Sequence, residues 1–339
     1  MENNKVTIHD IARALNIDSS TVSRALNNSP RVTQVTKFKV LNKATELGYQ
    51  RNLMASNFRK QKSNLIGVVV PRISRHFFSS VIAGVEEVAF ESGYNVIICQ
   101  SLESLDRERN ITETLLANRV DGVLISVSME TNSNDHLLQL KKNGTQFLFF
   151  DRHRQISGIN SVLIDDFQGG FDATEHLISK GCQNIAHLSG PQELKIYENR
   201  LNGYKSALEK HHIKYRPELV LYSRLMEKDG KESIEKLRSL PIKIDGVFAA
   251  NDVSAIGAMK HLKKNGVQIP KDVAIVGFSN EPISSIIEPS LTTIDQPGYQ
   301  MGKQATEILL EQIMNGKSLS NGKKIILKSS LIERESSRK

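Results

Sequence analysis

The chain has 339 residues, of which 39% are hydrophobic and 24% are charged, and its formal net charge is +8. This length exceeds what one hydrophobic core serves and suits a small domain joined to one or two larger ones. The longest apolar stretches, such as residues 65–70, are too short to span a membrane, and the first five residues lack the apolar core of a signal peptide. We therefore expect a cytoplasmic protein without membrane contact.

Positive charge is concentrated at the amino-terminal end. Residues 1–62 contain 11 Lys and Arg against 4 Asp and Glu, a net charge of +7, whereas residues 63–339 contain 34 against 33. A local excess of this kind predicts a polyanionic partner for this end only. Cys99 and Cys182 lie far apart in sequence and are expected to be reduced structural thiols.

Residues 1–50 have the pattern of three short helices. Asn16 suits a left-handed turn after the first helix, Asp18 or Ser19 suits the cap of the second, and Thr33 and Gly48 suit the start and end of the third. The residues expected to face inward are Ile11, Ala12 and Leu15, then Val22, Ala25 and Leu26, then Val35, Phe38, Leu41, Ala44 and Leu47. An ordinary three-helix bundle would give the same pattern, but the charge and the helix-turn-helix spacing favour a DNA-reading head.

The character of the chain changes at residue 64, after a basic, linker-like segment at 50–63. Apolar strands then alternate with amphipathic helices, which is typical of parallel sheets covered by helices. The expected strands are 65–70, 95–99, 122–126, 147–150, 185–188, 246–249 and 273–277, and the expected helices are 77–90, 107–117, 169–179, 201–210 and 253–264. Two doubly wound subdomains would fit this length, with a ligand at the carboxyl ends of the strands.

Motifs of nucleotide-dependent or hydrolytic enzymes are incomplete in this sequence. Residues 298–304 are one residue short of a phosphate-binding loop and have Gln304 where a hydroxyl must reach magnesium, so they fit the first turns of a helix better. Residues 277–281 miss the nucleophile elbow because Glu281 takes the place of the last glycine. We expect no catalytic activity, no metal and no cofactor.

Several motifs together resemble the lactose/galactose-repressor (LacI/GalR) family of bacterial transcription regulators. They are Thr7-Ile-His-Asp-Ile-Ala, Ser20-Thr-Val-Ser-Arg-Ala-Leu-Asn27, Asp151-Arg152, Arg200-x-x-Gly-Tyr204, Ala250-Asn-Asp-x-x-Ala255 and Pro289-x-Leu-Thr-Thr-Ile-Asp-Gln296. The resemblance implies a multidomain chain: an all-α helix-turn-helix head (5–50), a hinge helix (51–63) and an α/β core like that of periplasmic binding proteins (64–336). The core would comprise two doubly wound parallel-sheet subdomains, at about 64–162 with 294–325 and at about 163–291 with 326–336.

The resemblance also implies which residues of the head and hinge contact DNA. The second helix would enter the major groove, with Arg24 forked onto guanine and Ser19 and Ser20 bonded to bases. Phosphate contacts would come from Thr7, Thr21, Ser23, Asn27, Thr33, Thr36 and Tyr49. For the Ser and Thr residues the alternative is a helix cap, and for Arg24 it is a solvated helix face.

In the hinge, Asn52, Ala55 and Phe58 match the DNA-contacting positions of the family. Phe58 stands where the family has a leucine that opens a base step in the minor groove, and Arg51 stands where it usually has proline. Phe58 could instead be buried against the core. The family acts as a symmetric pair of heads on a pseudo-palindromic operator, and because no leucine repeat follows the last strand we expect a homodimer associated with the nucleoid.

A small polar effector is implied for the cleft of the core. The matching positions are Phe77, Phe78, Asp151, Arg152, Arg200, Asn251, Asp252, Ser279 and Gln296. These aromatic, carboxylate, amide and guanidinium groups suit a sugar, although Asp151 and Asp252 could instead cap the next helices. Ser279 replaces an aspartate of most sugar-sensing relatives, which leaves room for a phosphorylated or acidic sugar.

We thus expect a transcription regulator, acting as a repressor, whose operator affinity is set by a sugar-like effector. One alternative is a regulator controlled by a purine or by a phosphoprotein partner. The other is a sugar-binding protein of a transport system, which would have to be exported.

Overall fold

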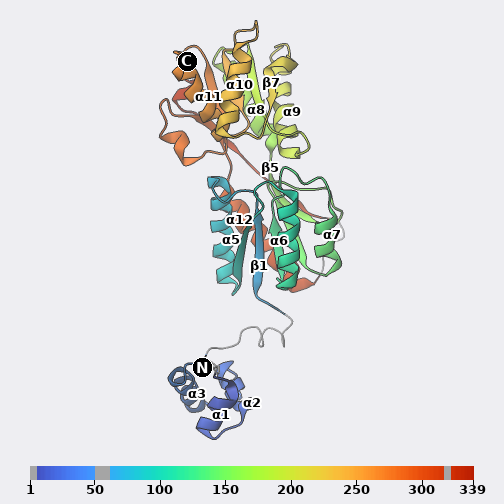
Figure 1. The fold of residues 1–339 in the computed structure, drawn as a ribbon, viewed down its shortest axis with the longest axis vertical. Coiled ribbons are helices and arrows are strands. Elements are labelled where there is room, and N and C mark those ends of the chain that lie inside the picture. Colours follow the sequence, from blue (N-terminus) through green and yellow to red (C-terminus); the bar gives the residue numbers. More distant parts are fainter. Residues whose placement is uncertain (1–5, 50–61, 317–321) are drawn as a thin grey trace. The chain divides into compact units, whose positions relative to one another are not determined.

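The structure, a computed structural model, describes residues 6–49, 62–316 and 322–339 and divides the chain into two compact parts, residues 1–63 and 64–339 (Figure 1). The first part is called the head here and the second the core. The hinge residues Arg51, Asn52, Ala55 and Phe58 lie outside the described residues.

The head consists of α1 (Ile8–Leu15), α2 (Ser19–Leu26) and α3 (Gln34–Glu46). Its small core contains Ile11, Val22 and Val40, which have no exposed surface. Three of the residues expected at the ends of these helices have the predicted conformation or contact. Asn16 has a left-handed backbone with φ of 52°, the Thr33 hydroxyl accepts a hydrogen bond from the Thr36 amide at 3.4 Å, and Gly48 has φ of 67°. Asp18 lies at the cap position of α2, but its side chain makes no capping hydrogen bond.

The inward face of α3 differs from the prediction. Val35, Phe38 and Leu41 are 66%, 67% and 51% exposed, and the buried residues are instead Lys37, Val40 and Ala44. Both sets of residues have the spacing of one helix face. The set that faces the core of the head is the one with fewer large apolar side chains. Lys37 tolerates burial because its ammonium group donates to the Asn28 side-chain oxygen at 2.7 Å and to the Asn28 carbonyl at 3.3 Å. Ala44 and the partly buried Leu47 are as expected.

The core contains two six-stranded sheets, which define its N-subdomain and C-subdomain. The N-subdomain sheet has the order β11-β5-β4-β3-β1-β2 and is wholly parallel. Its strands are β1 (Leu65–Val70), β2 (Asn95–Gln100), β3 (Gly122–Ile125), β4 (Gln146–Phe150), β5 (Asn160–Ile164) and β11 (Lys324–Leu327). The helices that cover it are α5 (His76–Glu91), α6 (Leu105–Ala117), α7 (Asp135–Lys142) and α12 (Gly298–Asn315).

The C-subdomain sheet has the order β12-β10-β9-β8-β6-β7, in which only the edge strand β12 pairs in the antiparallel direction. Its strands are β6 (Ile185–Ser189), β7 (Val220–Tyr222), β8 (Gly246–Ala249), β9 (Ala274–Phe278), β10 (Thr292–Asp295) and β12 (Ser330–Ile332). Its helices are α8 (Asp166–Ser179), α9 (Lys195–Lys210), α10 (Glu227–Arg238) and α11 (Asp252–Lys264), with short 3₁₀ turns at Pro217–Leu219, Pro282–Ser285 and Glu335–Ser337.

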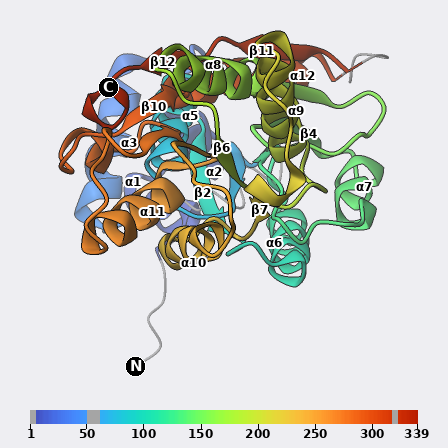
Figure 2. The same ribbon diagram turned by 90° about the horizontal axis from the view of Figure 1, so that it is seen from above.

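Helices cover both faces of each sheet, as the long apolar strands require. In β1, Val68 and Val70 pack in the cluster that includes α5 and α12, whereas Val69 packs in the cluster that includes α6 and α7. In the C-subdomain, α8 and α9 lie on one side of the sheet and α10 and α11 on the other (Figure 2). The doubly wound architecture inferred from the alternating pattern is therefore confirmed.

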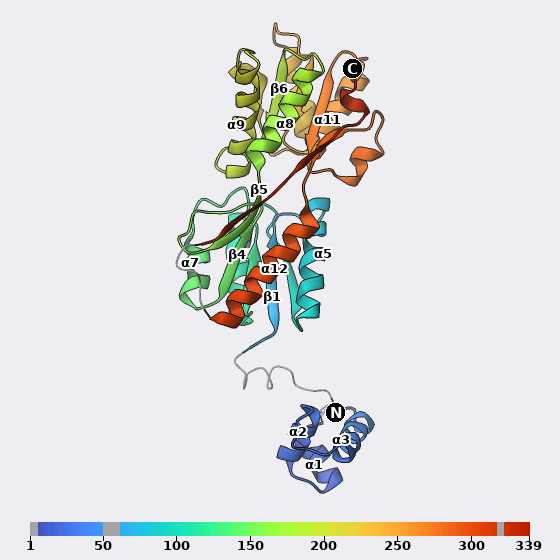
Figure 3. The same cartoon turned by 180° about the vertical axis from the view of Figure 1, so that it is seen from behind.

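The chain crosses between the two subdomains at three short connections. They lead from β5 to α8, from β10 to α12 and from β11 to β12. Figure 3 shows the last of these as an extended stretch that runs from one subdomain to the other. Because each connection has only a few residues, the carboxyl ends of the strands of both sheets meet near the crossings.

Glycines allow close helix contacts in the core. A Cβ atom at Gly203 of α9 would lie 2.1 Å from the Phe167 carbonyl oxygen, and one at Gly170 of α8 would lie 2.3 Å from the Arg200 carbonyl oxygen. The α5–α12 contact has the same form, with Gly84 against the backbone of Tyr299. These helix pairs can approach only where no side chain intervenes.

We expect Gly203→Ala to destabilise the core by about 1–3 kcal/mol, because the added methyl group forces α9 away from α8. Helix propensity alone would give the opposite sign, since alanine is favoured over glycine by about 1 kcal/mol. The urea midpoint of unfolding measures the change. Asn202→Ala, at the exposed neighbouring position of the same helix, is the control. A Gly203→Ala protein as stable as this control would contradict the close contact.

Candidate functional sites

The candidate DNA-reading residues lie on the surface of α2. Ser20 and Arg24 are exposed and are four residues apart, so they share one face of the helix, whereas Ser19, Thr21 and Ser23 are partly buried. Within residues 6–49 the Arg24 guanidinium makes no hydrogen bond or ion pair. Its donors are therefore available to a partner from outside the head.

The other candidate residues of the head have local roles as well. The Thr7 hydroxyl donates to Asp10 Oδ2 at 2.7 Å and the Thr7 amide donates to the same oxygen at 2.9 Å, which lowers the pKa of Asp10. The Asn27 amide group donates to the Ser23 carbonyl at 2.8 Å. Thr7 and Thr33 are thus helix caps, the alternative considered for them, and they hold helix amino termini at the surface, where a phosphate is favourably bound.

Two further residues of this set also have structural contacts within the head. The Thr36 hydroxyl is 3.0 Å from that of Thr33, and Tyr49 packs in part against the apolar core of the head.

In the core, one cavity brings together all nine residues expected to face an effector. They come from the segments that follow the carboxyl ends of β1, β4, β8, β9 and β10, and from α9. The cavity is also lined by five residues that the sequence did not point out: Arg75, Ile196, Tyr197, Val253 and Glu281. It lies at the strand ends where parallel sheets bind their ligands.

Aromatic rings form one wall of this cavity. Phe77 and Phe78 begin α5 and are only 6% and 4% exposed. Their rings are 5.2 Å apart edge to face, and Phe78 contacts Phe150 of β4 in the same way at 6.4 Å. The rings are thereby fixed as a rigid apolar surface on which the C–H groups of a ligand can lie.

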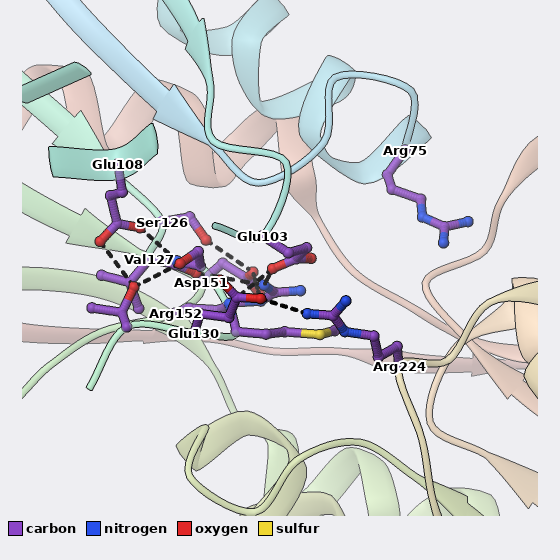
Figure 4. A network of polar contacts seen from close by, with 12 residues as sticks. Arg75, Glu103, Glu108, Ser126, Val127, Glu130, Asp151, Arg152 and Arg224 are labelled. Carbon is purple, nitrogen blue, oxygen red and sulfur yellow. Dashed lines mark hydrogen bonds and ion pairs between the residues drawn. The ribbon is translucent and has the colours of Figure 1, made fainter. Parts of the chain in front are cut away.

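Asp151 and Arg152 follow β4 and are both buried (Figure 4). Arg152 Nη1 donates to Glu103 Oε2 at 2.8 Å, whereas Arg152 Nε has no hydrogen-bond partner among the described residues. Asp151 has a left-handed backbone with φ of 58° and accepts a hydrogen bond from the Ser126 hydroxyl at 3.3 Å. Burial raises the pKa of Asp151. A left-handed backbone and a buried donor without a hydrogen-bond partner are features found at binding sites.

Arg200 is fixed in the cavity wall by α8. Its Nε and Nη2 atoms donate to Asp166 Oδ1 at 2.8 and 2.7 Å, and Nη1 donates to the Ala250 carbonyl at 2.7 Å. The guanidinium carbon lies 3.6 Å from the centre of the Phe278 ring. Because Asp166 is buried, its pKa is raised to about 7. The helix that contains Arg200 begins at Lys195, six residues earlier than the helix predicted at 201–210.

Asn251 and Asp252 line the cavity, but their side chains are engaged in hydrogen bonds to backbone groups. The Asn251 side-chain oxygen caps α11 by accepting from the Ser254 amide at 2.8 Å, and its amide group donates to the Leu225 carbonyl at 3.0 Å. Asp252 Oδ2 accepts from the Glu281 amide at 2.7 Å, and burial raises the pKa of Asp252 to about 7. The capping role considered for Asp252 belongs to Asn251, while Asp252 fixes the loop after β9.

Ser279 and Gln296 form a pair at the ends of β9 and β10. The Ser279 hydroxyl donates to Gln296 Oε1 at 2.7 Å, and Gln296 Nε2 has no hydrogen-bond partner in the described part of the chain. The hydroxyl therefore orients the glutamine so that its amide donor is unused. Ser279 has φ of 112°, a strained conformation for a residue with a side chain.

Contacts between the subdomains surround the cavity. The Glu281 carboxylate of the C-subdomain accepts from the His76 amide at 3.2 and 3.3 Å, at the start of α5 in the N-subdomain. Arg75, beside it, makes one side-chain contact from Nη2 to the Met226 sulfur at 3.6 Å. In the sequence, Arg75 could have been recognised as a candidate only by its charge and its position two residues before Phe77.

Comparison with known protein families matches both parts of the chain. Residues 7–52 match the model for bacterial regulatory proteins of the lacI family, and residues 63–335 match the model for periplasmic binding proteins and the sugar-binding domain of the LacI family. The chain belongs to the LacI family. Members of this family are DNA-binding transcriptional regulators rather than enzymes, so the resemblance, the fold class and the regulatory function expected from the sequence are confirmed.

Whole-chain relatives agree with this assignment to the LacI family. The HTH-type transcriptional regulator RegA of Clostridium saccharobutylicum is 35% identical over 97% of this chain and 98% of its own length. Among solved structures, the lac repressor dimer bound to operator and the anti-inducer ONPF has a TM-score of 0.86 at 26% identity, with 98% of this chain and 99% of that one covered. The complex of the regulator CelR with cellobiose has a TM-score of 0.75 at 26% identity, with 98% and 100% covered.

None of the helices that the structure describes in this LacI-family chain is both long and apolar enough to cross a lipid bilayer.

Proposed function

We propose that this LacI-family protein is a homodimeric repressor that binds a pseudo-palindromic operator and is controlled by a sugar-like effector in the core. The observation that supports effector control is the convergence of Phe77, Asp151, Arg200, Gln296 and their neighbours on one cavity from several strand ends. We assign residues 5–50 to the DNA-binding head, 51–63 to the hinge and 64–336 to the effector-binding and dimerisation core.

In this proposal α2 enters the major groove. The exposed Arg24 reads guanine, and Ser20, on the same helix face, contacts a neighbouring base or phosphate. Two heads related by symmetry read the two half-sites, as the solved lac repressor dimer on its operator suggests. Because its target is chromosomal DNA, the protein works in the cytoplasm in association with the nucleoid.

The effector lies between the subdomains. Phe77 and Phe78 offer an apolar face, and Gln296 Nε2 and Arg152 Nε offer donors without a hydrogen-bond partner among the described residues. A polyhydroxylated ring with an apolar face matches both features, and the relative CelR is solved with cellobiose. Since Glu281 and Arg75 bring opposite subdomains to the same cavity, ligand binding changes the relative stability of the subdomain arrangements and thereby the operator affinity.

The test is a fluorescence anisotropy titration of the full-length protein with a duplex of its own promoter region and with a scrambled duplex. At moderate salt we expect the promoter duplex to bind about 10³-fold more tightly or better. Affinity for both duplexes should fall steeply with salt as counterions are released. Addition of sugars should change the promoter affinity by about fivefold or more. Equal affinity for the two duplexes, with and without a metabolite extract, would overturn the proposal.

A further inference from the structure

A second cavity opens beside the effector cavity and is rich in positive charge. It is called the cationic chamber here, and its charged lining consists of Arg72, Arg75, Arg152, Arg224 and Lys228 together with a single carboxylate, that of Glu103. The two cavities share Arg75 and Arg152 as well as Phe78, Tyr197 and Asn251. A ligand that contacts the aromatic wall therefore lies within reach of these cations.

The carboxylates nearby pair with only two of the five cations. Arg152 is paired with Glu103 at 2.8 Å, and Arg224 Nη2 donates to Glu130 Oε1 at 2.7 Å, as Figure 4 shows. In the part of the chain that the structure describes, Arg72, Arg75 and Lys228 form no ion pair. The figure shows Arg75 apart from the paired cluster around Glu103 and Asp151. Three of the five cations of the chamber thus have no ion-pair partner in the described part of the chain.

Among the cations without an ion pair, Arg75 is buried only in part, because a fraction of its side chain still meets solvent. This partial burial lowers the pKa of its guanidinium group. An arginine remains charged at physiological pH, and the Glu281 carboxylate across the cavity offsets part of the desolvation cost without forming an ion pair with Arg75 among the described residues. Close by, Arg152 is only 6% exposed and its Nε donor has no hydrogen-bond partner among the described residues. Both unused donor groups border the shared part of the two cavities.

We propose that the effector is an organic anion, namely a sugar that carries a phosphate or a carboxylate group. The anionic group lies in the cationic chamber on Arg75, with Arg72 and Lys228 around it, while the hydroxyl-bearing body contacts Phe77 and Gln296 in the first cavity. Ser279, which lines the first cavity, is neutral and adds no charge that would repel an anion. The inference rests on the proposed function, because it assigns the ligand class of the same effector cavity.

Matched ligand pairs test the inference on the full-length protein by isothermal titration calorimetry. The probes are glucose 6-phosphate with glucose, ribose 5-phosphate with ribose, gluconate, and inorganic phosphate alone. We expect at least one anionic sugar to bind about tenfold or more tightly than its neutral parent, the scale of one charged hydrogen bond. Arg75→Gln should reduce the preference for that ligand over its neutral parent by about tenfold or more.

Two further variants distinguish the loss of a ligand contact from a general loss of stability. Lys228→Gln changes an exposed residue at the rim, so it should keep the thermal midpoint of unfolding and still weaken the anionic sugar severalfold. Arg107→Gln, at an exposed position of α6 outside both cavities, is the matched control and should change neither. Neutral parents that bind as tightly as the anionic sugars, or anionic sugars that do not bind, would overturn the inference.

The operator titration distinguishes this failure from a failure of the proposed function. If an uncharged sugar alone changes operator affinity, effector control stands and the anionic class is wrong. If the promoter duplex binds no better than the scrambled one, the regulatory proposal itself fails.

Discussion

Replacement of Arg24 by alanine is expected to abolish discrimination between operator and scrambled DNA. A guanidinium group forked onto guanine contributes about 1–3 kcal/mol of discrimination, and a symmetric dimer uses it twice, which corresponds to a loss on the order of 30-fold to 10⁴-fold. Arg24 is exposed and makes no contact that supports the head among residues 6–49. The fold of the head should therefore be unchanged, and the loss should appear only in the ratio of the two affinities.

Arg13→Ala is the matched control for this prediction. Arg13 is another exposed arginine of the head, on α1, and its ion pair with Asp10 at 3.6 Å is at the surface. Its removal lowers the charge of the head by the same amount and should weaken both duplexes alike. Both variants are compared by anisotropy at one salt concentration. An Arg24→Ala protein that keeps the wild-type ratio of affinities would exclude Arg24 from base reading.

The elements that the sequence predicted best are those with continuous or strongly periodic apolar residues. Strands β1 and β8 coincide with their predicted ranges, and α5 and α11 differ by one residue at most at each end. Helix α10 was missed because its buried face has only two large apolar residues, Ile234 and Leu237, beside Gly230 and Ser233. Its packing depends on a glycine that approaches the backbone of α11, and periodicity of apolar residues does not reveal such a contact.

Helix α3 shows a second limit of the apolar pattern. Val35 and Phe38 are large and suitably spaced, yet they face outward, while Lys37 is buried. The choice between the two faces depends on Asn28, whose oxygen atoms receive the lysine ammonium group from a loop nine residues away. Residue type and spacing are local properties, whereas this compensation is tertiary.

The effector cavity shows what a family resemblance can and cannot supply. All nine expected residues line it, but their roles depend on neighbours: Asn251 caps α11 and Asp252 fixes a loop. Of the cations in the chamber only Arg152 was predicted, because Arg75 and Lys228 belong to different subdomains and are brought together by the folded core. The sequence position of one charged residue does not reveal which distant charged residues will lie beside it.

Arg200→Gln is expected to destabilise the core by about 3–5 kcal/mol at pH 8, because it leaves the buried Asp166 without its partner. The variant also loses the hydrogen bond to the Ala250 carbonyl and the contact with the Phe278 ring. Urea unfolding at several pH values gives the free energy. Lys210→Gln, which removes an exposed ion pair with Glu175 from the same helix, is the control and should change stability by less than about 1 kcal/mol.

The pH dependence tests the reason for this loss. In the native protein the pKa of Asp166 is raised from 3.8 to about 7, so folding favours its protonated form. The resulting contribution to the free energy of unfolding is fully present below pH 3.8 and is lost as the pH rises through 7. Without the Arg200 charge the pKa of Asp166 should rise further. The deficit of Arg200→Gln should then be smallest near pH 5 and grow above pH 7, where only the variant retains the proton in its folded state.

Asp166→Asn removes the titrating carboxyl group, so the double variant Arg200→Gln/Asp166→Asn should lose the growth of the deficit above pH 7 while keeping the part due to the other contacts of Arg200. A double variant whose deficit still increases with pH would show that another group is responsible. A single variant with the same deficit at pH 5 and pH 9 would show that packing on Phe278, rather than the charge of Asp166, is what Arg200 supplies to the core.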